Sequence, residues 1–294
     1  MHEPVLLKEV LQFLNPRPGQ FIIDGTVNGG GHARAILQNI MPGGTFLGVD
    51  LDAAMIAKKK PEYKGERYAH GNYADIPIIL KKEKLDRADG LLVDLGFSSE
   101  QLAGAGKGFS FTDAAAGEPL KMTYDDAATP LAELLRELDQ EQLANVIYEF
   151  GGERRSRAIA KAIVTAGKRK PITTAGELAR IVREAVPGNY EHGRIDAATR
   201  TFQALRIYAN DELGNLKKLL GELGEIVKPG GRVAIITFHS LEDRAVKQAF
   251  QEGAKNGTLE LLTKKPVAAS REEELKNPRA RSAKVRAAIV RYRL

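Results

Sequence analysis

Cysteine is absent from this sequence of 294 residues. Its absence excludes disulfides, thiolate metal sites and every mechanism that needs a cysteine nucleophile. Long hydrophobic runs are also missing, because no segment approaches the ~18 uninterrupted apolar residues that predict a membrane-spanning helix. The first residues, Met1 to Pro4, lack the basic-then-apolar layout of a signal peptide. We therefore expect a cytoplasmic protein with no membrane partner.

The sequence does contain enough apolar material for a full core, together with an uneven positive charge. The apolar content is 43%, and the formal net charge is +6 with a pI near 9.3. Residues 151–170 hold seven Lys or Arg against one Glu, a pattern as typical of a solvated helix face as of RNA binding. Residues 264–294 hold ten Lys or Arg against three Glu. There, arginines alternate with small residues from Asn277 to Arg286, which suits contact with phosphates rather than packing of a core, so Arg279, Arg281 and Lys284 are candidate RNA-binding residues.

A glycine-rich stretch organises the first part of the chain. Phe21 to Asp24 is an apolar run that ends in a carboxylate, and Gly25 to Gly31 is a glycine-rich loop. Helical spacing then resumes from Ala33 to Ile40. A second apolar run ends in Asp50, 19 residues beyond Gly31, where an aspartate of a nucleotide-binding fold meets a ribose hydroxyl. This order of elements is typical of a nucleotide-binding turn.

The loop favours S-adenosylmethionine over a dinucleotide. A dinucleotide fingerprint reads G-x-G-x-x-G, but Arg34 stands where the third glycine should be. Asp24 at the head of the loop would repel a pyrophosphate, whereas it suits the ammonium group of a methionine moiety. The alternatives are an NAD-linked oxidoreductase, which Arg34 disfavours, and a tight turn that binds no ligand.

Two further apolar runs end in residues suited to a ligand site. Tyr68 to Tyr73 is expected to be a short third strand, and Tyr73 either stacks on adenine or closes the edge of the core. Gly90 to Val93 is expected to be the fourth strand and stops at Asp94. Parallel sheets bind ligands beyond the carboxyl ends of their strands, so we expect one site formed by Asp24, Asp50, Tyr73 and Asp94.

Helical signals replace the strand rhythm in the middle of the chain. From Thr129 to Tyr208 every strong signal is helical, including helix starts after Thr129 and capping boxes at Asp139–Gln142 and Thr174–Glu177. We therefore expect an α/β domain interrupted by an inserted all-helical domain, with boundaries at 1–104, 105–208 and 209–294.

The α/β pattern returns in the last part of the chain. Arg232 to Phe238 alternates as a strand, and Leu259 to Thr263 is expected to pair with Ala287 to Tyr292 across a long connection, giving seven strands. At the other end of the chain, Pro4 to Leu14 reads as a covering helix with Pro4 in its first turn.

Several long motifs carry a family resemblance. They are Pro4-Val5-Leu6-Leu7, Gly30-Gly31-His32, Asp94-Leu95-Gly96 with Ser98-Ser99, Gly108-Phe109-Ser110-Phe111, Thr199-Arg200 through Arg206, Phe238 through Arg244, and Asn277 through Arg286. Over essentially its whole length the chain resembles the bacterial 16S rRNA cytosine-N4 methyltransferases, the RsmH or MraW family. The resemblance implies a Rossmann-like class I methyltransferase sheet with an inserted all-helical domain, S-adenosylmethionine as cofactor, and a cytosine in the decoding region of the small subunit as target. It also implies cofactor contacts at Gly30, Gly31, His32, Asp50, Tyr73, Asp94 and Gln101.

The chain departs from the family pattern in three places. Asn28 stands where the family usually has glycine, and asparagine tolerates the left-handed conformation better than most residues. Residues 119–125 and 196–198, in the substrate-facing half, differ from the family's Pro-Leu-Asp-Met-Arg-Met-Asp and His-Pro-Ala, with Lys121 and Asp196 among the changes. These two segments leave open whether the target RNA is the same.

The missing cysteine is an independent test of the chemistry. Methylation at C5 of cytosine requires a thiolate to add to the ring, whereas an exocyclic amine can attack the sulfonium methyl directly. Asp94 is the first candidate to orient the amine and accept its proton. His239 is the second, with the alternative that it only fixes a strand-to-helix turn, where Ser240 and Asp243 resemble a capping box. No metal is expected, because no spacing of His, Asp and Glu resembles a ligand set.

The expected partner is 16S rRNA within the small ribosomal subunit, and a homodimer is left open. One rival interpretation is a catalytically idle RNA-binding protein that retains the methyltransferase fold. Another is a methyltransferase that acts on a different RNA. Whether methyl transfer occurs, and to which RNA, distinguishes the three.

Overall fold

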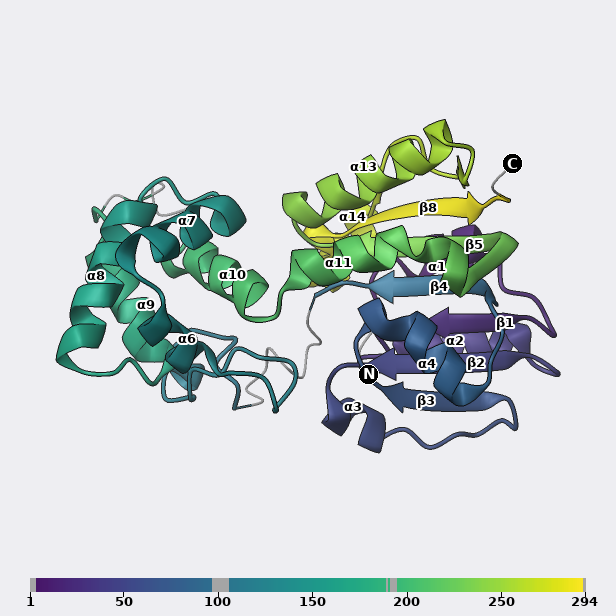
Figure 1. Ribbon diagram of the computed structural model, residues 1–294, viewed down its shortest axis with the longest axis horizontal. Coiled ribbons are helices and arrows are strands. Elements are labelled where there is room, and N and C mark those ends of the chain that lie inside the picture. The colour runs from purple at the N-terminus through teal and green to yellow at the C-terminus, as the bar shows by residue number, and fades with distance from the viewer. Residues whose placement is uncertain (1–3, 97–105, 189, 191–194, 293–294) are drawn as a thin grey trace. The chain divides into compact units, whose positions relative to one another are not determined.

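The computed structural model describes residues 4–96, 106–188, 190 and 195–292. The chain divides into two compact units, one formed by Met1–Phe97 with Leu213–Leu294 and the other by Ser98–Glu212. We call the first the sheet unit and the second the helical unit (Figure 1). Within the described residues, no helix combines the length and the apolar character that crossing a membrane requires.

The sheet unit is built on one mixed sheet. Its described strands are β1 (Phe21–Asp24), β2 (Thr45–Asp50), β3 (Glu66–His70), β4 (Ala88–Asp94), β5 (Val227–Thr237), β6 (Leu259–Leu261), β7 (Val267–Ala268) and β8 (Lys284–Val290). They lie in the order β3-β2-β1-β4-β5-β8-β6, with β7 also paired to β8. Neighbouring strands from β3 to β5 are parallel, whereas β8 is antiparallel to β5, β6 and β7. This order confirms the expected Rossmann-like class I methyltransferase sheet and the pairing across a long connection near the C-terminus.

Some strand boundaries differ from the sequence-based expectations. β3 ends at His70, short of Tyr73, because the Asn72 side chain caps a following 3-10 helix. β5 begins at Val227 and not at Arg232, so it includes Pro229, Gly230 and Gly231 beside a register shift. β8 begins at Lys284, earlier than expected. β7 has only two residues, too few to leave a periodic pattern, so the described sheet has eight strands and not seven.

Helices cover both faces of this sheet (Figure 1). One face packs against α1 (Leu7–Leu14), α2 (Gly31–Ile40) and the 3-10 helix η4 (Pro278–Ser282). The other packs against α4 (Ile76–Glu83), α11 (Glu212–Gly221), α12 (Leu223–Ile226) and α13 (Ser240–Lys255). The shorter elements are α3 (Ala53–Ala57), η1 (Tyr73–Asp75) and α14 (Arg271–Lys276). Ile22 faces the first layer and Ile23 the second, and both are fully buried, which is why the strands read as continuous apolar runs.

The N-terminal helix begins later than expected. α1 starts at Leu7, after Leu6 in the left-handed conformation, and Pro4 precedes it. Pro4 packs instead against the start of α2, where a Cβ on Gly31 would lie 3.0 Å from the proline ring. Gly31 is therefore needed for this close approach, independently of any ligand.

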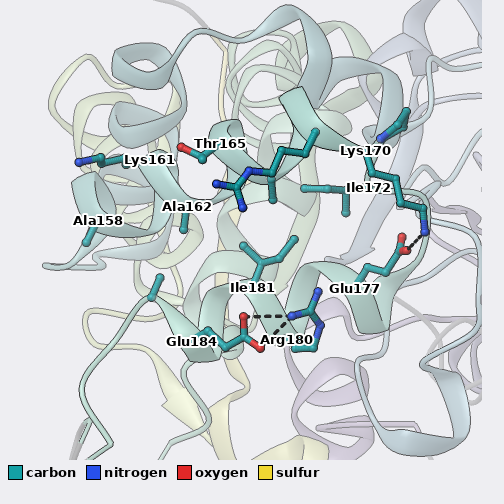
Figure 2. Close-up of a pocket in the computed structure, with 14 residues that line it drawn as sticks. Ala158, Lys161, Ala162, Thr165, Lys170, Ile172, Glu177, Arg180, Ile181 and Glu184 are labelled. Carbon is teal, nitrogen blue, oxygen red and sulfur yellow. Dashed lines mark hydrogen bonds and ion pairs between the residues drawn. The ribbon is translucent and has the colours of Figure 1, made fainter.

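The helical unit has a hydrophobic core of its own. Its described helices are η2 (Asp113–Ala115), α6 (Leu131–Glu137), α7 (Gln140–Gly151), α8 (Ser156–Arg169), α9 (Ala175–Glu184) and α10 (Ala198–Ala209). The capping boxes at Asp139–Gln142 and Thr174–Glu177 are confirmed, whereas α6 has Pro130 and not Thr129 at its N-cap. The core gathers buried residues of α7, α8, α9 and α10. Outside that core, α8 and α9 line an open groove (Figure 2).

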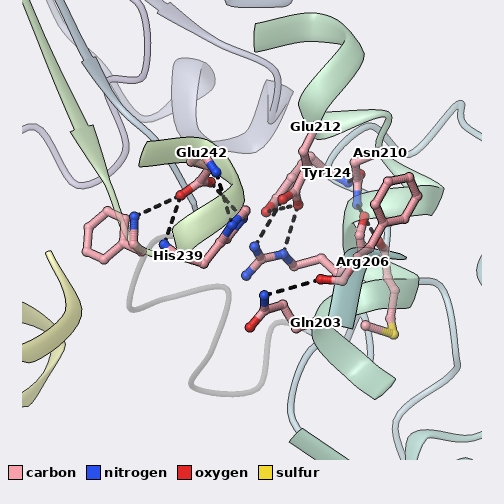
Figure 3. Close-up of polar contacts among 10 residues, drawn as sticks. Tyr124, Gln203, Arg206, Asn210, Glu212, His239 and Glu242 are labelled. Carbon is pink, nitrogen blue, oxygen red and sulfur yellow. Dashed lines mark hydrogen bonds and ion pairs between the residues drawn. The ribbon is translucent and has the colours of Figure 1, made fainter. Parts of the chain in front are cut away.

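A buried ion pair fixes the C-terminal end of α10. Arg206 donates to Glu212 from Nε at 2.8 Å and from Nη2 at 3.0 Å. The Tyr124 hydroxyl donates to the same carboxylate at 3.0 Å, and the Tyr124 N–H donates to the Asn210 side chain at 2.9 Å (Figure 3). The divergent segment 119–125 therefore has a structural role inside the helical unit.

Candidate functional site

The carboxyl ends of three adjacent parallel strands bring three aspartates together. Asp24 ends β1, Asp50 ends β2 and Asp94 ends β4. β1 and β4 also flank the point where the strand order reverses, which is where open α/β sheets bind their ligands. The carboxylates of Asp94 and Asp50 both act electrostatically on Asp24. The structure thus gathers the carboxylates that the sequence assigned to one sheet edge.

Asp24 is buried and only half satisfied. It is 1% exposed, and its Oδ1 accepts the N–H of Thr26 at 3.1 Å. Its Oδ2 accepts no hydrogen bond from any described residue. Burial raises the pKa of Asp24 to about 7, against the opposing effects of His32 and of the Thr26 N–H. A cationic hydrogen-bond donor at Oδ2 would satisfy this oxygen and favour the ionised form.

Asp50 anchors the glycine loop. Its Oδ2 accepts the N–H of Asn28 at 2.8 Å, and its Oδ1 accepts the N–H of Asp52 at 2.9 Å. Asn28 has φ 47° and Gly30 has φ 81°, so both adopt the left-handed conformation that asparagine and glycine tolerate. Burial raises the pKa of Asp50. Each carboxylate oxygen keeps a further lone pair with which to accept a ligand hydroxyl.

Tyr73 reaches the same edge from η1 and not from the end of β3. A Cβ on Gly25 would lie 3.3 Å from the Tyr73 Cβ and 3.3 Å from Val93, so Gly25 makes room for Tyr73 beside the end of β1. The tyrosine is half-buried and packs partly against the sheet core. Its stacking on adenine stays a prediction.

Asp94 is held between the glycine loop and α2. Its N–H donates to Thr26 Oγ1 at 2.7 Å, and its Oδ2 lies 3.6 Å from His32 Nδ1. Its Oδ1 is buried and accepts no hydrogen bond from any described residue. Burial raises the pKa of Asp94 to about 7, an increase that Arg279 opposes and Glu242 reinforces. Asp94 is therefore a carboxyl group poised to exchange a proton near neutral pH.

His32 is a buried residue of the first turn of α2. It is 5% exposed, and its Nε2 lies 2.9 Å from the Val5 carbonyl oxygen. That oxygen can only accept, so Nε2 carries the proton and Nδ1 faces Asp94. Burial lowers the pKa of His32. His32 thus holds the N-terminal segment at Val5 and places its unprotonated Nδ1 beside Asp94.

Arg279 acts on this site, which the sequence did not predict. It lies half-buried in η4, where Asn277 accepts its N–H at 3.3 Å. Burial lowers the pKa of Arg279 and Asp94 raises it, while the Arg279 charge lowers the pKa of Asp94. No local pattern could have revealed this pairing, because the two residues belong to opposite ends of the chain.

The rest of the basic C-terminal segment is divided between surface and core. Arg281 is exposed, whereas Lys284 is half-buried with Nζ 4.0 Å from an Asp243 carboxylate oxygen. Arg286 is buried and donates to Asp243 at 2.7 Å. The expectation that this segment does not pack a core is wrong, because its small residues fill the space beneath it: Ala280, Ala283, Val285 and Ala287 are all buried.

His239 caps α13 immediately after β5. Its Nδ1 accepts the N–H of Glu242 at 3.3 Å, and Glu242 accepts the N–H groups of Phe238 at 2.8 Å and of His239 at 3.2 Å (Figure 3). The expected capping box of Ser240 with Asp243 is wrong by one residue, because α13 already includes Ser240. The turn-fixing role of His239 is thereby established, and its catalytic role stays a prediction.

Two further contributors escaped the sequence reasoning, and one candidate falls outside the described residues. Thr26 supplies the hydroxyl that receives the Asp94 N–H, and Glu242 acts on the Asp94 carboxyl while it caps α13. The position of Thr26 in a loop between a strand and a helix was a usable signal, because such a loop faces the next parallel strand. Gln101 lies outside the described residues.

The sequence comparisons with known proteins agree on one family. The sequence matches the profile of the MraW methylase family over residues 1–291. A relative from Deinococcus radiodurans, named ribosomal RNA small subunit methyltransferase H, is 44% identical over 286 residues, which covers 97% of this chain and 88% of the relative. A relative of the same name from Thermotoga neapolitana is 42% identical over 295 residues, which covers 98% of this chain and 95% of the relative. Among solved structures, a putative rRNA-methylase from Clostridium thermocellum aligns with a TM-score of 0.45 at 8% identity, covering 99% of each chain.

Proposed function

The chain belongs to the MraW methylase family, and from that premise we propose that it methylates the exocyclic N4 amine of a cytidine in the decoding region of 16S rRNA, with S-adenosylmethionine as methyl donor. The observation that carries the proposal is the pair of buried carboxylates, Asp24 and Asp94, each with one oxygen that lacks a described hydrogen-bond partner, at the reversal point of the sheet. A cationic cofactor fits this site, because it replaces repulsion among three aspartates with attraction.

The residues of the sheet edge divide the binding of the cofactor among them. Asp24 would hold the ammonium group, Asp50 the ribose hydroxyls and Tyr73 the adenine. Gly30 and Gly31 would let the backbone approach the cofactor closely. His32 would keep its Nδ1 beside Asp94 through its hydrogen bond to Val5. S-adenosylmethionine supplies an electrophilic methyl group on a sulfonium.

We assign to Asp94 the role of orienting the N4 amine and accepting its proton. The N4 lone pair is delocalised into the ring, so an acceptor must orient the amine and take the proton that it loses when the new N–C bond forms. A carboxyl with a pKa of about 7 suits this task, and Arg279 favours its ionised form. His239 follows the neighbouring strand and is the second candidate to receive the proton.

The RNA substrate follows from the relatives and from the distribution of charge. Both relatives are named as small-subunit rRNA methyltransferases. Arg281 and Lys284 would contact the RNA backbone beside the site, and the helical unit would recognise the substrate. Another RNA as target is the second candidate, because Lys121 and Asp196 depart from the family pattern. Asp196 nevertheless has a structural role, since it pairs with Arg183 at 2.9 Å and accepts the N–H of Ala198.

The test is a transfer assay with mass spectrometry of the product. Small subunits from cells that lack this protein are incubated with the purified chain and S-adenosylmethionine bearing an isotope-labelled methyl group. Digestion to nucleosides should yield labelled N4-methylcytidine. Labelled C5-methylcytidine, or label only in a different RNA, would contradict the proposal, and no label in any RNA would favour the idle RNA-binding protein.

Asp50→Ala should weaken S-adenosylmethionine binding by about 1.5–3 kcal/mol, because it removes a charged acceptor for the ribose hydroxyls and releases the Asn28 N–H. Isothermal calorimetry measures the change. Asp86→Ala is the matched control: it removes the same charge from an exposed position before β4, so it should leave cofactor affinity unchanged. If Asp50→Ala bound S-adenosylmethionine with the affinity of the parent, the ribose hydroxyls would not contact Asp50.

Cofactor affinity should rise with pH and level off above neutrality. The carboxyls of Asp24 and Asp94, each with a pKa of about 7, are largely protonated in mild acid and ionised in mild base. A cation binds the ionised forms, so we expect at least a roughly tenfold gain in affinity from about pH 6 to about pH 8. Calorimetry in buffers of different ionisation enthalpy should also record proton release near neutral pH. A flat profile would show that neither carboxylate meets the cofactor's charge.

A further inference from the structure

One face of α8, together with the turn before it, carries a row of exposed cations. Arg154 and Arg157, then Lys161 and Lys168, are all exposed. Across residues 4–96, 106–188, 190 and 195–292, none of these four side chains makes a hydrogen bond or ion pair. Arg154 precedes the helix, and the spacing of four and seven residues places Arg157, Lys161 and Lys168 along one side of α8. At a rise of about 1.5 Å per residue the row from Arg157 to Lys168 extends about 16 Å, long enough to follow several phosphates of one strand.

The neighbouring charges do not compensate this row. The single acidic residue of the segment 151–170, Glu153, is 1% exposed, accepts a hydrogen bond from the Tyr190 hydroxyl and lies 3.9 Å from Arg200. It is therefore engaged inside the helical unit and does not screen the row from solvent.

The two sides of the groove between α8 and α9 differ in whether their cations have ion-pair partners (Figure 2). On the α9 side, Lys170 pairs with Glu177 at 2.9 Å and Arg180 pairs with Glu184 at 2.8 Å. On the α8 side, Lys161 and Arg169 border the groove with no such partner among the described residues, above a wall of small side chains, Ala158, Ala162, Thr165 and Ala166. Small side chains let a polymer backbone approach the helix, and the excess of positive charge selects an anionic one.

We propose that this surface, the α8 face defined by Arg154, Arg157, Lys161, Lys168 and Arg169, binds the phosphate backbone of the RNA substrate. The inference rests on the proposed function for the identity of the RNA. An anionic membrane is the weaker occupant, because the apolar residues of α8, Ile159 and Ile163, are buried in the core of the helical unit and cannot insert into lipid. The face adds a second point of attachment to the one at Arg281.

The test compares two triple variants of the full-length chain. Arg157→Gln/Lys161→Gln/Lys168→Gln removes three of the five charges of the α8 face, whereas Lys81→Gln/Lys82→Gln/Lys255→Gln removes the same charge from exposed positions of the sheet unit. Affinity for purified small-subunit rRNA is measured by filter binding over a range of salt concentrations. We expect the α8 variant to bind about tenfold or more weakly, with a shallower dependence of affinity on salt, because each lost phosphate contact removes about 0.7–0.9 from the slope. Cofactor affinity and melting temperature should be those of the parent.

Three results would overturn the proposal. The α8 variant could keep the RNA affinity and salt slope of the parent, or the control triple variant could lose as much RNA affinity as the α8 variant. The third result is that the parent binds phosphatidylserine vesicles and the α8 variant does not. Failure of the proposed function has a different signature, because a parent that forms no N4-methylcytidine in small subunits still reports its RNA affinity in the binding assay. The two outcomes are therefore read separately.

Discussion

Asp94→Asn will lower single-turnover methyl transfer to small subunits by about 10²–10⁴-fold, the range for loss of a positioned proton acceptor. The substitution keeps the shape of the side chain and removes its charge. It leaves the backbone hydrogen bond from Asp94 to Thr26 in place, since the N–H is the donor. The loss should therefore reflect chemistry at the Oδ atoms and not collapse of the turn.

Two controls separate proton transfer from cofactor binding in this variant. Calorimetry gives the cofactor affinity directly, so the transfer rate can be measured with the site saturated. Asp86→Asn removes one exposed carboxylate before β4 and should leave both quantities unchanged. In the parent at saturating cofactor, the transfer rate should rise with pH as Asp94 ionises, at a lower pH than in the free protein because the bound cation favours the carboxylate, and that rise should vanish in Asp94→Asn. A variant within threefold of the parent at saturating cofactor would remove Asp94 from proton transfer, and His239 would take its place for the next test.

The sheet and the three aspartates could be predicted because both follow from local patterns. Each of Asp24, Asp50 and Asp94 directly ends an apolar run, and parallel strands align their carboxyl ends at one edge. Residues at the ends of parallel strands can therefore be predicted to be neighbours without any knowledge of side-chain contacts.

The features that escaped prediction depend on single residues or on distant partners. His239 and not Ser240 is the N-cap of α13, and a shift of one residue decides which carboxylate caps the helix. The alternation of arginine with small residues near the C-terminus fits a phosphate-binding tail and also a buried strand, because alanine gives little hydrophobic signal. Burial of Ala280 and Ala283 resolves that ambiguity. The same packing holds η4 against the sheet and brings Arg279 within electrostatic reach of Asp94.

Arg279→Ala should lower methyl transfer by about 100-fold at neutral pH, and Arg281→Ala should hardly change it when RNA is saturating. Arg279 lowers the pKa of the buried Asp94, so its removal should raise that pKa and the free energy of the ionised carboxylate. Fewer molecules then carry an acceptor for the amine proton, and the rise of the rate with pH should move to higher pH. The exposed Arg281 acts on no site residue in this way, so its loss should weaken RNA binding and flatten the salt dependence only.

The pH profile is the measurement that distinguishes these roles, because a residue that only contacts phosphate cannot move it. Arg279→Lys supplies the matched control: it retains the positive charge, so it should keep the apparent pKa of the parent even if the geometry of the guanidinium is lost. Single-turnover rates of the three variants, measured with saturating small subunits over about pH 5–9, give the comparison. An Arg279→Ala profile with the parent's midpoint, together with a loss of RNA affinity like that of Arg281→Ala, would assign both arginines to phosphate contacts and leave Asp94 to be controlled by burial and Glu242 alone.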